Sequence, residues 1–161
     1  MGKRTLSAQG VNDRREDLRK LMDRYLSLVS RTSYRIMCDR RDSEWITVGV
    51  MMSIWQDLGS FPDDALLELE ILRRTCRQCR IRLLRRRLLS LFSIDPDIFV
   101  ASSPTVPSYD EYIARQAWQI FCRASSGLSD RQRVAFTLCE LENIPEKTVA
   151  TIEGTEKGAT L

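Results

Sequence analysis

The chain has 161 residues, a net charge of +3 and a hydrophobic content of 43%, enough for a core in one ordinary domain or two small ones. Histidine is absent, which excludes histidine metal ligands, histidine general bases and Ser-His-Asp triads. No run reaches the roughly 18 to 20 apolar residues of a membrane span, and five scattered cysteines are typical of reduced cytoplasmic thiols.

The first long helix is predicted by apolar residues spaced by threes and fours from Leu18 to Ile36. Asp13 and Glu16 have the spacing of a capping pair, so we expect the helix to begin there. Residues 39–42 are all charged and are the expected connection to the next helix.

A second and a third helix follow this connection. An apolar stripe from Ile46 to Leu58 predicts the second, which we expect to end near Gly59. Residues 61–64 suit a turn and a helix start, because proline pre-sets the backbone and acids favour a helix N-terminus. The third helix is then expected to reach about Leu91.

The segment 93–109 contains three prolines among serines, threonines and aspartates, which a helix cannot accommodate, so we interpret it as a linker. Helices are expected again beyond it, since two capping boxes appear, Ser108 with Glu111 and Ser129 with Gln132. The predicted fold is all-α, with two small helical domains at residues 12–92 and 110–161.

Arginine dominates the positive charge, with 21 arginines against four lysines. Eight of them lie between residues 73 and 87 without a single acid, and on a helix Arg73, Arg77 and Arg80 line up. The guanidinium groups of such a strip repel one another unless an anion is near. Binding to nucleic acid removes this repulsion, and it releases the counterions of the phosphates, which favours binding at low salt. The pattern therefore favours nucleic acid; a solvated basic face or a surface for an acidic protein are the alternatives.

The C-terminal segment has the spacing of a helix-turn-helix. Ala150 is the small residue that lets two helices pack closely, and Gly154, four residues later, suits a left-handed turn. Thr160 stands where an apolar residue is usual. On spacing alone, an ordinary helical hairpin is an equal alternative to DNA binding.

This segment resembles region 4 of bacterial RNA polymerase sigma factors of the extracytoplasmic-function type, and the matching residues are Leu128, Gln132, Arg133, Phe136, Leu138, Val149, Ala150 and Gly154. The resemblance implies that the next helix enters the major groove of the promoter minus-thirty-five element. Its expected contacts are Thr155, Glu156, Lys157, Gly158 and Thr160. Because the sequence stops at Leu161, we expect this recognition helix to be incomplete.

The N-terminal part is similar to sigma region 2, through Asp42-Ser43-Glu44-Trp45, the stretch from Ile71 to Gln78 and the basic ending Arg85-Arg86-Arg87. The resemblance implies that the second helix binds the clamp helices of the largest subunit of core RNA polymerase, through Asp42, Glu44, Val48, Met51 and Trp55. It implies contacts of the third helix and its preceding loop with the minus-ten element, through Phe61, Arg73, Arg74, Arg77, Gln78, Arg80, Arg85 and Arg86. Phe61 is the candidate for holding an unpaired base.

The sequence thus predicts a cytoplasmic sigma factor, divergent and with a shortened region 4, that binds core polymerase and promoter DNA. It also admits an anti-sigma factor as a partner. The alternative is a sigma-like module that binds polymerase or nucleic acid without initiating transcription. We expect no enzyme activity, cofactor or metal: Cys76 and Cys79 lack the further ligands of a zinc site, and are interpreted as buried or partly buried thiols.

Overall fold

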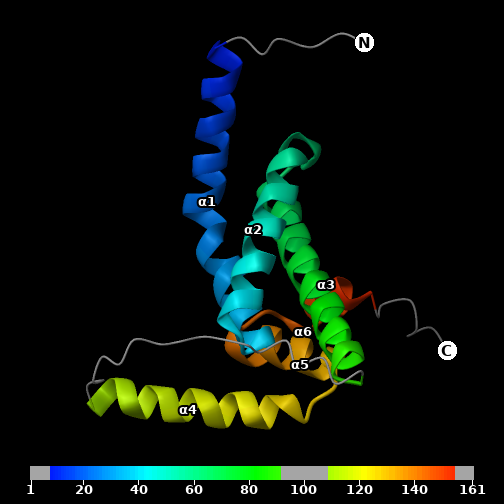
Figure 1. Cartoon of the computed structure of the whole chain (residues 1–161). Coiled ribbons are helices and arrows are strands. Elements are labelled where there is room, and N and C mark those ends of the chain that lie inside the picture. Colours follow the sequence, from blue (N-terminus) through cyan, green and yellow to red (C-terminus); the bar gives the residue numbers. More distant parts are fainter. Residues whose placement is uncertain (1–7, 92–108, 155–161) are drawn as a thin grey trace, which may run out of the picture.

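The computed structural model describes the backbone of residues 8–91 and 109–154, and the side chains of 13–91 and 110–154. These residues form helices and turns with no strand among them, which confirms the predicted all-α class (Figure 1). The elements are α1 (Ala8–Met37), α2 (Arg40–Gln56), the short 3₁₀ turn η1 (Leu58–Ser60), α3 (Asp64–Leu91), α4 (Tyr109–Ser126), α5 (Asp130–Phe136), the π-helical turn η2 (Thr137–Leu141) and α6 (Glu146–Glu153).

The connection between α1 and α2 is shorter than the sequence predicted. The side chain of Asp39 accepts a hydrogen bond of 2.7 Å from the backbone N–H of Asp42, so α2 begins inside the charged run instead of after it. Cys38 ends α1 in a left-handed conformation, with φ of 52°. The start of α1 was also misplaced: the helix begins at Ala8, so Asp13 and Glu16 lie within it and do not cap it.

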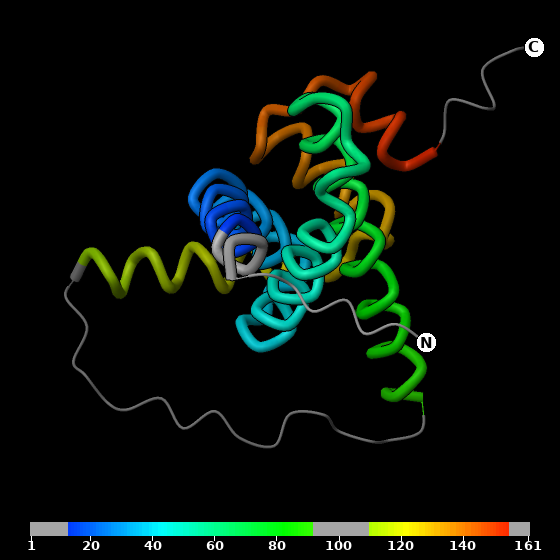
Figure 2. The backbone as a smooth tube through the Cα atoms, turned by 90° about the horizontal axis from the view of Figure 1, so that it is seen from above, coloured from blue at the N-terminus to red at the C-terminus, as the bar shows by residue number. Residues whose placement is uncertain are grey.

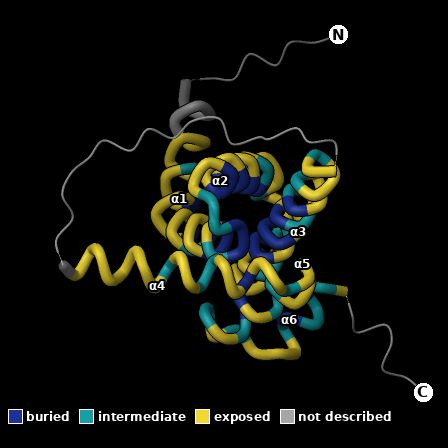
Figure 3. Tube along the Cα trace, turned by 60° about the horizontal axis from the view of Figure 1, so that its bottom comes forward, coloured by how far each residue is buried: buried dark blue, intermediate teal, exposed yellow. Residues whose placement is uncertain are grey.

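Helices α1, α2 and α3 form a bundle whose buried residues lie on the facing sides (Figure 3). Val29, Ile36, Ile54 and Ile71 are fully buried at its centre. Each belongs to a series of apolar residues spaced by threes and fours along its own helix, and this spacing, which predicted the helices, places the series on one helix face.

The segment α5–η2–α6, here called the C-terminal block, packs against α1 and α3. Its buried residues Val134, Leu138, Val149 and Ile152 belong to the same hydrophobic cluster as the bundle. The carboxylate of Glu142 anchors it: this side chain is 2% exposed, and it accepts hydrogen bonds from Arg31 (2.7 Å) and Arg35 (2.8 Å) of α1.

Helix α4 runs across the end of the bundle and extends beyond it (Figures 1 and 2). Its C-terminal half packs on α1 and the C-terminal block. Trp118 stacks on Tyr34 of α1 with ring centroids 4.7 Å apart, Phe121 lies 5.0 Å from Trp118, and the hydroxyl of Ser125 lies 3.5 Å from the Cys38 sulfur.

Several local predictions are confirmed. Ser129 and Gln132 form the expected capping box, Gly154 ends α6 in a left-handed conformation with φ of 68°, and Cys76 and Cys79 are buried. Ser108 and most of the proposed linker lie outside the described residues, and the division into two domains stays a prediction.

Candidate nucleic-acid interface

Three hollows lie end to end between α2 and α3, and together they are called the α2–α3 groove. The hollow near the end of α2 has a volume of about 290 Å³, and it shares Gly49 and Gln78 with a middle hollow of about 300 Å³. The middle hollow shares Asp42, Arg82 and Arg85 with a third, of about 240 Å³, at the start of α2. The groove therefore follows most of the contact between the two helices.

Arginines outnumber acids in this groove, so its field attracts anions. Of the residues predicted to contact the minus-ten element, six line it, and Arg80 and Phe61 do not. Seven arginines and four acids line the three hollows: Arg41, Arg73, Arg74, Arg77, Arg82, Arg85 and Arg86, with Asp39, Asp42, Asp57 and Glu70.

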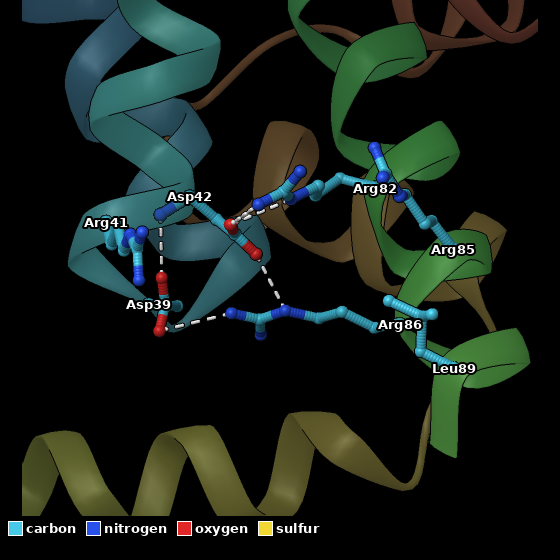
Figure 4. A pocket seen from close by; sticks show the side chains of 7 residues that line it. All are labelled: Asp39, Arg41, Asp42, Arg82, Arg85, Arg86 and Leu89. Carbon is cyan, nitrogen blue, oxygen red and sulfur yellow. Dashed lines mark hydrogen bonds and ion pairs between the residues drawn. The ribbon is translucent and has the colours of Figure 1, made fainter. Parts of the chain in front are cut away.

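Asp42 organises one end of the groove (Figure 4). Its side chain is 5% exposed, with Arg82 Nη2 2.6 Å from Oδ1 and Arg86 Nε 2.7 Å from Oδ2. Arg86 also lies 3.1 Å from a carboxylate oxygen of Asp39. A carboxylate withdrawn from water is tolerated when cations face it, so Arg82 and Arg86 are engaged in holding α2 to α3.

Arg74 is held in the same way at the other end of the groove. Its guanidinium lies 2.9 Å from both Glu70 and Asp57 and donates a hydrogen bond to the hydroxyl of Ser53. Burial alone would lower the pKa of Arg74, but the hydrogen bonds to Glu70 and Asp57 raise it above its ordinary value. Arg74 is thus another structural cation.

Arg41, Arg77 and Arg85 differ from these. All three are exposed, and within the residues that the structure describes none of them has an ion pair or hydrogen bond to an acid. Their guanidiniums keep their full set of donors, which match a phosphate in bidentate geometry. They are therefore the groove arginines whose donors are free to bind an anion.

The adjacent side of α3 faces the C-terminal block across a larger hollow of about 530 Å³, which shares Arg73 and Arg77 with the groove. Arg73, Arg77 and Arg80 all line it, as their predicted alignment on one helix face requires. Arg80 lies 3.2 Å from Glu153, whose side chain is 7% exposed, and Arg87 pairs with Asp130. The acids that the arginine strip needs are therefore supplied in part by the chain itself.

The burial of Cys76 follows from this packing, since the residue lines the same hollow. Burial raises the pKa of its thiol to about 12, and the nearby carboxylate of Glu153 acts in the same direction. The pKa of Cys79 is also raised well above its ordinary value, mainly by burial. Both thiols therefore stay protonated at neutral pH, and among the described residues no group of acids and cysteines has the arrangement of a metal site.

Some of the residues predicted to bind polymerase are exposed, and others are buried in the bundle. Asp42 and Met51 are buried in the bundle, while Glu44 and Val48 are exposed. Trp55 is half-buried, and its Nε1 donates a hydrogen bond of 3.2 Å to the backbone oxygen of Arg14.

An exposed apolar stripe on α2 was not predicted as a unit. Trp45 is 72% exposed, Val48 63%, and Met52 is also exposed. Their spacing of three and four residues places them on one helix face. That spacing is visible in the sequence, but it could be recognised as a surface only once the buried stripe of Ile46, Val50 and Ile54 was known to face the bundle.

The remaining predicted contacts fall elsewhere. Phe61 lies in the loop between η1 and α3, where it is half-buried and packs against the hydrophobic cluster. The minus-thirty-five residues, from Thr155 to Thr160, lie outside the described residues.

Comparison of the chain with protein-family models, with curated proteins and with solved structures found no match. In the part of the chain that the structure describes, no helix combines the length and the apolar character needed to cross a membrane.

Proposed function

We propose that this chain acts as a sigma-type transcription initiation factor, which binds core RNA polymerase through the exposed face of α2 and single-stranded promoter DNA along the α2–α3 groove. The observation that carries the proposal is the groove itself. It contains three arginines without acidic partners among the described residues, and it lies beside an exposed apolar stripe on the same helix, α2.

The groove suits a nucleic-acid strand for two reasons. Arg41, Arg77 and Arg85 are spread along its length, so they can neutralise phosphates at several points of one strand, with release of counterions. Trp45 lines the middle hollow, and an exposed aromatic ring beside cationic side chains is a platform on which a base can stack.

The apolar stripe suits a helical partner. Val48 and Met52 project from one face of α2 beside Trp45, and an apolar helix face of this kind docks against another helix or into an apolar groove. Trp45, which lines the groove, is left to the strand. In the proposed complex this partner is the clamp-helix region of core polymerase. The chain would melt promoter DNA through binding energy to the single strand, with no chemical step of its own.

A second candidate is a sigma-type module that binds polymerase or nucleic acid without initiating transcription. It is favoured by the ion pairs that hold the C-terminal block against α3, from Glu153 to Arg80 and from Asp130 to Arg87. A factor that reads two promoter elements needs its two ends apart on the DNA, and these contacts hold them together.

The test is reconstitution of the full chain with core RNA polymerase, followed by transcription from a library of genomic DNA fragments. The proposal expects co-elution with core enzyme and discrete start sites. Val48→Asp places a charge in the apolar stripe of α2 and should abolish co-elution. Leu66→Asp places the same charge at an exposed apolar site on α3 and should leave co-elution unchanged. Co-elution without start sites supports the second candidate. The absence of co-elution and start sites contradicts the first candidate, and the second is contradicted as well if the chain also fails to bind single-stranded DNA.

A further inference from the structure

Helix α4 carries two apolar faces, and in the described part of the chain one of them packs against other elements while the other stays exposed. The packed face presents Trp118, Phe121 and Ser125 to α1 and the C-terminal block. A second face, about a third of a turn around the helix from the first, carries Ile113, Ala117, Ile120 and Ala124. Residues spaced by four, three and four form one continuous stripe on a helix. All four are exposed, with Ile113 at 48% and Ile120 at 68%, so this outer stripe has no partner within the described part of the chain.

The outer stripe is complementary in size to itself. When two α4 helices are laid antiparallel about a two-fold axis midway between Ala117 and Ile120, Ile113 of one copy faces Ala124 of the other, and Ala117 faces Ile120. Each large side chain thus meets a small one at all four positions. Alternation of large and small residues lets two helices interdigitate at close range, and an isologous contact of this kind closes as a dimer.

The charges of α4 select the antiparallel arrangement. Its first turn holds Asp110 and Glu111, and its last turn holds Arg123. Antiparallel pairing sets the acidic end of one helix beside the basic end of the other and opposes the two helix dipoles, which is favourable. Parallel pairing would bring the two acidic ends together.

The position of α4 leaves this stripe accessible. The helix extends beyond the bundle, and its long axis crosses the end of α1 and α2 (Figures 1 and 2). The inner face is the one that meets α1 at Tyr34. The outer stripe is turned about a third of a turn from that face, and its isoleucines stay exposed. We propose that a second copy of the chain docks here, and that the protein forms a symmetric dimer through antiparallel α4 helices.

Sedimentation velocity of the full chain over a range of concentrations tests this proposal. A reversible monomer–dimer equilibrium is expected. Ile120→Glu should raise the dimer dissociation constant by at least about tenfold, because it replaces apolar area that the dimer buries with a charge. The matched control is Leu66→Glu, which places the same charge at an exposed apolar site on α3 and should leave the equilibrium unchanged. Circular dichroism should show native helix content for both variants. A protein that is monomeric at all concentrations, or a dimer that Ile120→Glu does not weaken, overturns the proposal.

The register is tested by cross-linking. In the antiparallel pair, the double variant Ile113→Cys/Ala124→Cys should form a disulfide between position 113 of one copy and 124 of the other, identified by peptide mass spectrometry. These positions are eleven residues apart on one helix, roughly 16 Å, so the bond cannot form within a chain. The single variant Ile113→Cys should give no 113–113 bond. A 113–113 bond indicates parallel helices and contradicts the proposed dimer.

Discussion

The two sides of α3 hold their arginines in different ways. On the groove side, Arg82 and Arg86 share the buried carboxylate of Asp42, which belongs to the adjacent helix α2. On the other side, Arg80 and Arg87 pair with acids of the C-terminal block. The first set holds the bundle together, and the second attaches the block to it.

The difference teaches that one run of arginines can serve three purposes. Six of its eight members pair with acids of α2, of α3 itself, of the turn after α2 or of the C-terminal block. The other two, Arg77 and Arg85, have no acidic partner in the described residues. A basic helix is therefore a poor guide to nucleic-acid contacts until the paired arginines have been separated from the free ones. The following changes break or sharpen this comparison, from the largest expected effect to the smallest.

Glu142→Gln should release the C-terminal block most strongly. The carboxylate is almost fully buried between Arg31 and Arg35, and removing its charge leaves two cations without their partner. We expect a loss of about 2 kcal/mol in the free energy of unfolding, below the usual cost of breaking a buried pair because both arginines are partly exposed. Urea denaturation followed by circular dichroism measures it. Glu140→Gln, at an exposed neighbouring acid, is the control, and equal losses for the two variants would refute the anchoring role.

Asp42→Asn should have opposite effects on stability and on DNA binding. It removes the carboxylate that Arg82 and Arg86 share, at a cost of about 1 to 2 kcal/mol after allowance for the partly exposed arginines. It also leaves the groove one positive charge richer, so single-stranded DNA should bind several-fold more tightly at low salt. Fluorescence anisotropy with a labelled oligonucleotide measures the affinity. A stability loss with weaker DNA binding would place the strand elsewhere.

Alkaline pH should destabilise the packing of α3 through its buried thiol. The pKa of Cys76 is about 12 in the folded chain against an ordinary value of 9.0, so the folded state keeps the proton longer than the unfolded state. The corresponding stability is complete below pH 9 and is lost as the pH rises towards 12, at up to about 1.4 kcal/mol per pH unit. Urea unfolding at pH 8 to 10.5 should show a shallower decline for Cys76→Ala than for the unchanged chain. Parallel declines would show that Cys76 is not the titrating group.

Gly49→Ala should give a small gain. Gly49 lies within α2 and lines two hollows of the groove, and a Cβ added there meets no atom within 4 Å. Alanine should raise the free energy of unfolding by up to about 1 kcal/mol through helix propensity alone. DNA affinity should stay unchanged, because a methyl group alters neither charge nor the width of the groove much. A marked loss of affinity would show that the strand lies against the backbone of α2.

Much of the helical fold could be predicted from the sequence, because its signals are local. Apolar spacing located the helices of the bundle, Ser129 and Gln132 marked the start of α5, and Gly154 marked the end of α6. The start of α1 was missed, since residues 8–12 continue the helix without an apolar stripe or a recognisable cap.

The candidate site could be predicted only in part, because pairing depends on distant residues. The partner of Arg82 is 40 positions away, at Asp42, and that of Arg80 is 73 positions away, at Glu153. No local pattern distinguishes these arginines from Arg77 and Arg85. The sequence therefore located the basic helix, and the structure was needed to separate its paired arginines from its free ones.

The most direct test compares two double variants that remove the same charge from α3. Single-stranded DNA binding should be measured against salt concentration for Arg77→Ala/Arg85→Ala and for Arg80→Ala/Arg87→Ala. The account predicts that the first pair weakens binding and reduces the magnitude of the salt slope by about 1.4, the loss of two phosphate contacts, with the free energy of unfolding unchanged. The second pair should mainly lower stability. Equal losses of affinity and slope from both pairs, or a larger loss from Arg80→Ala/Arg87→Ala, would contradict the assignment of the free arginines to nucleic acid.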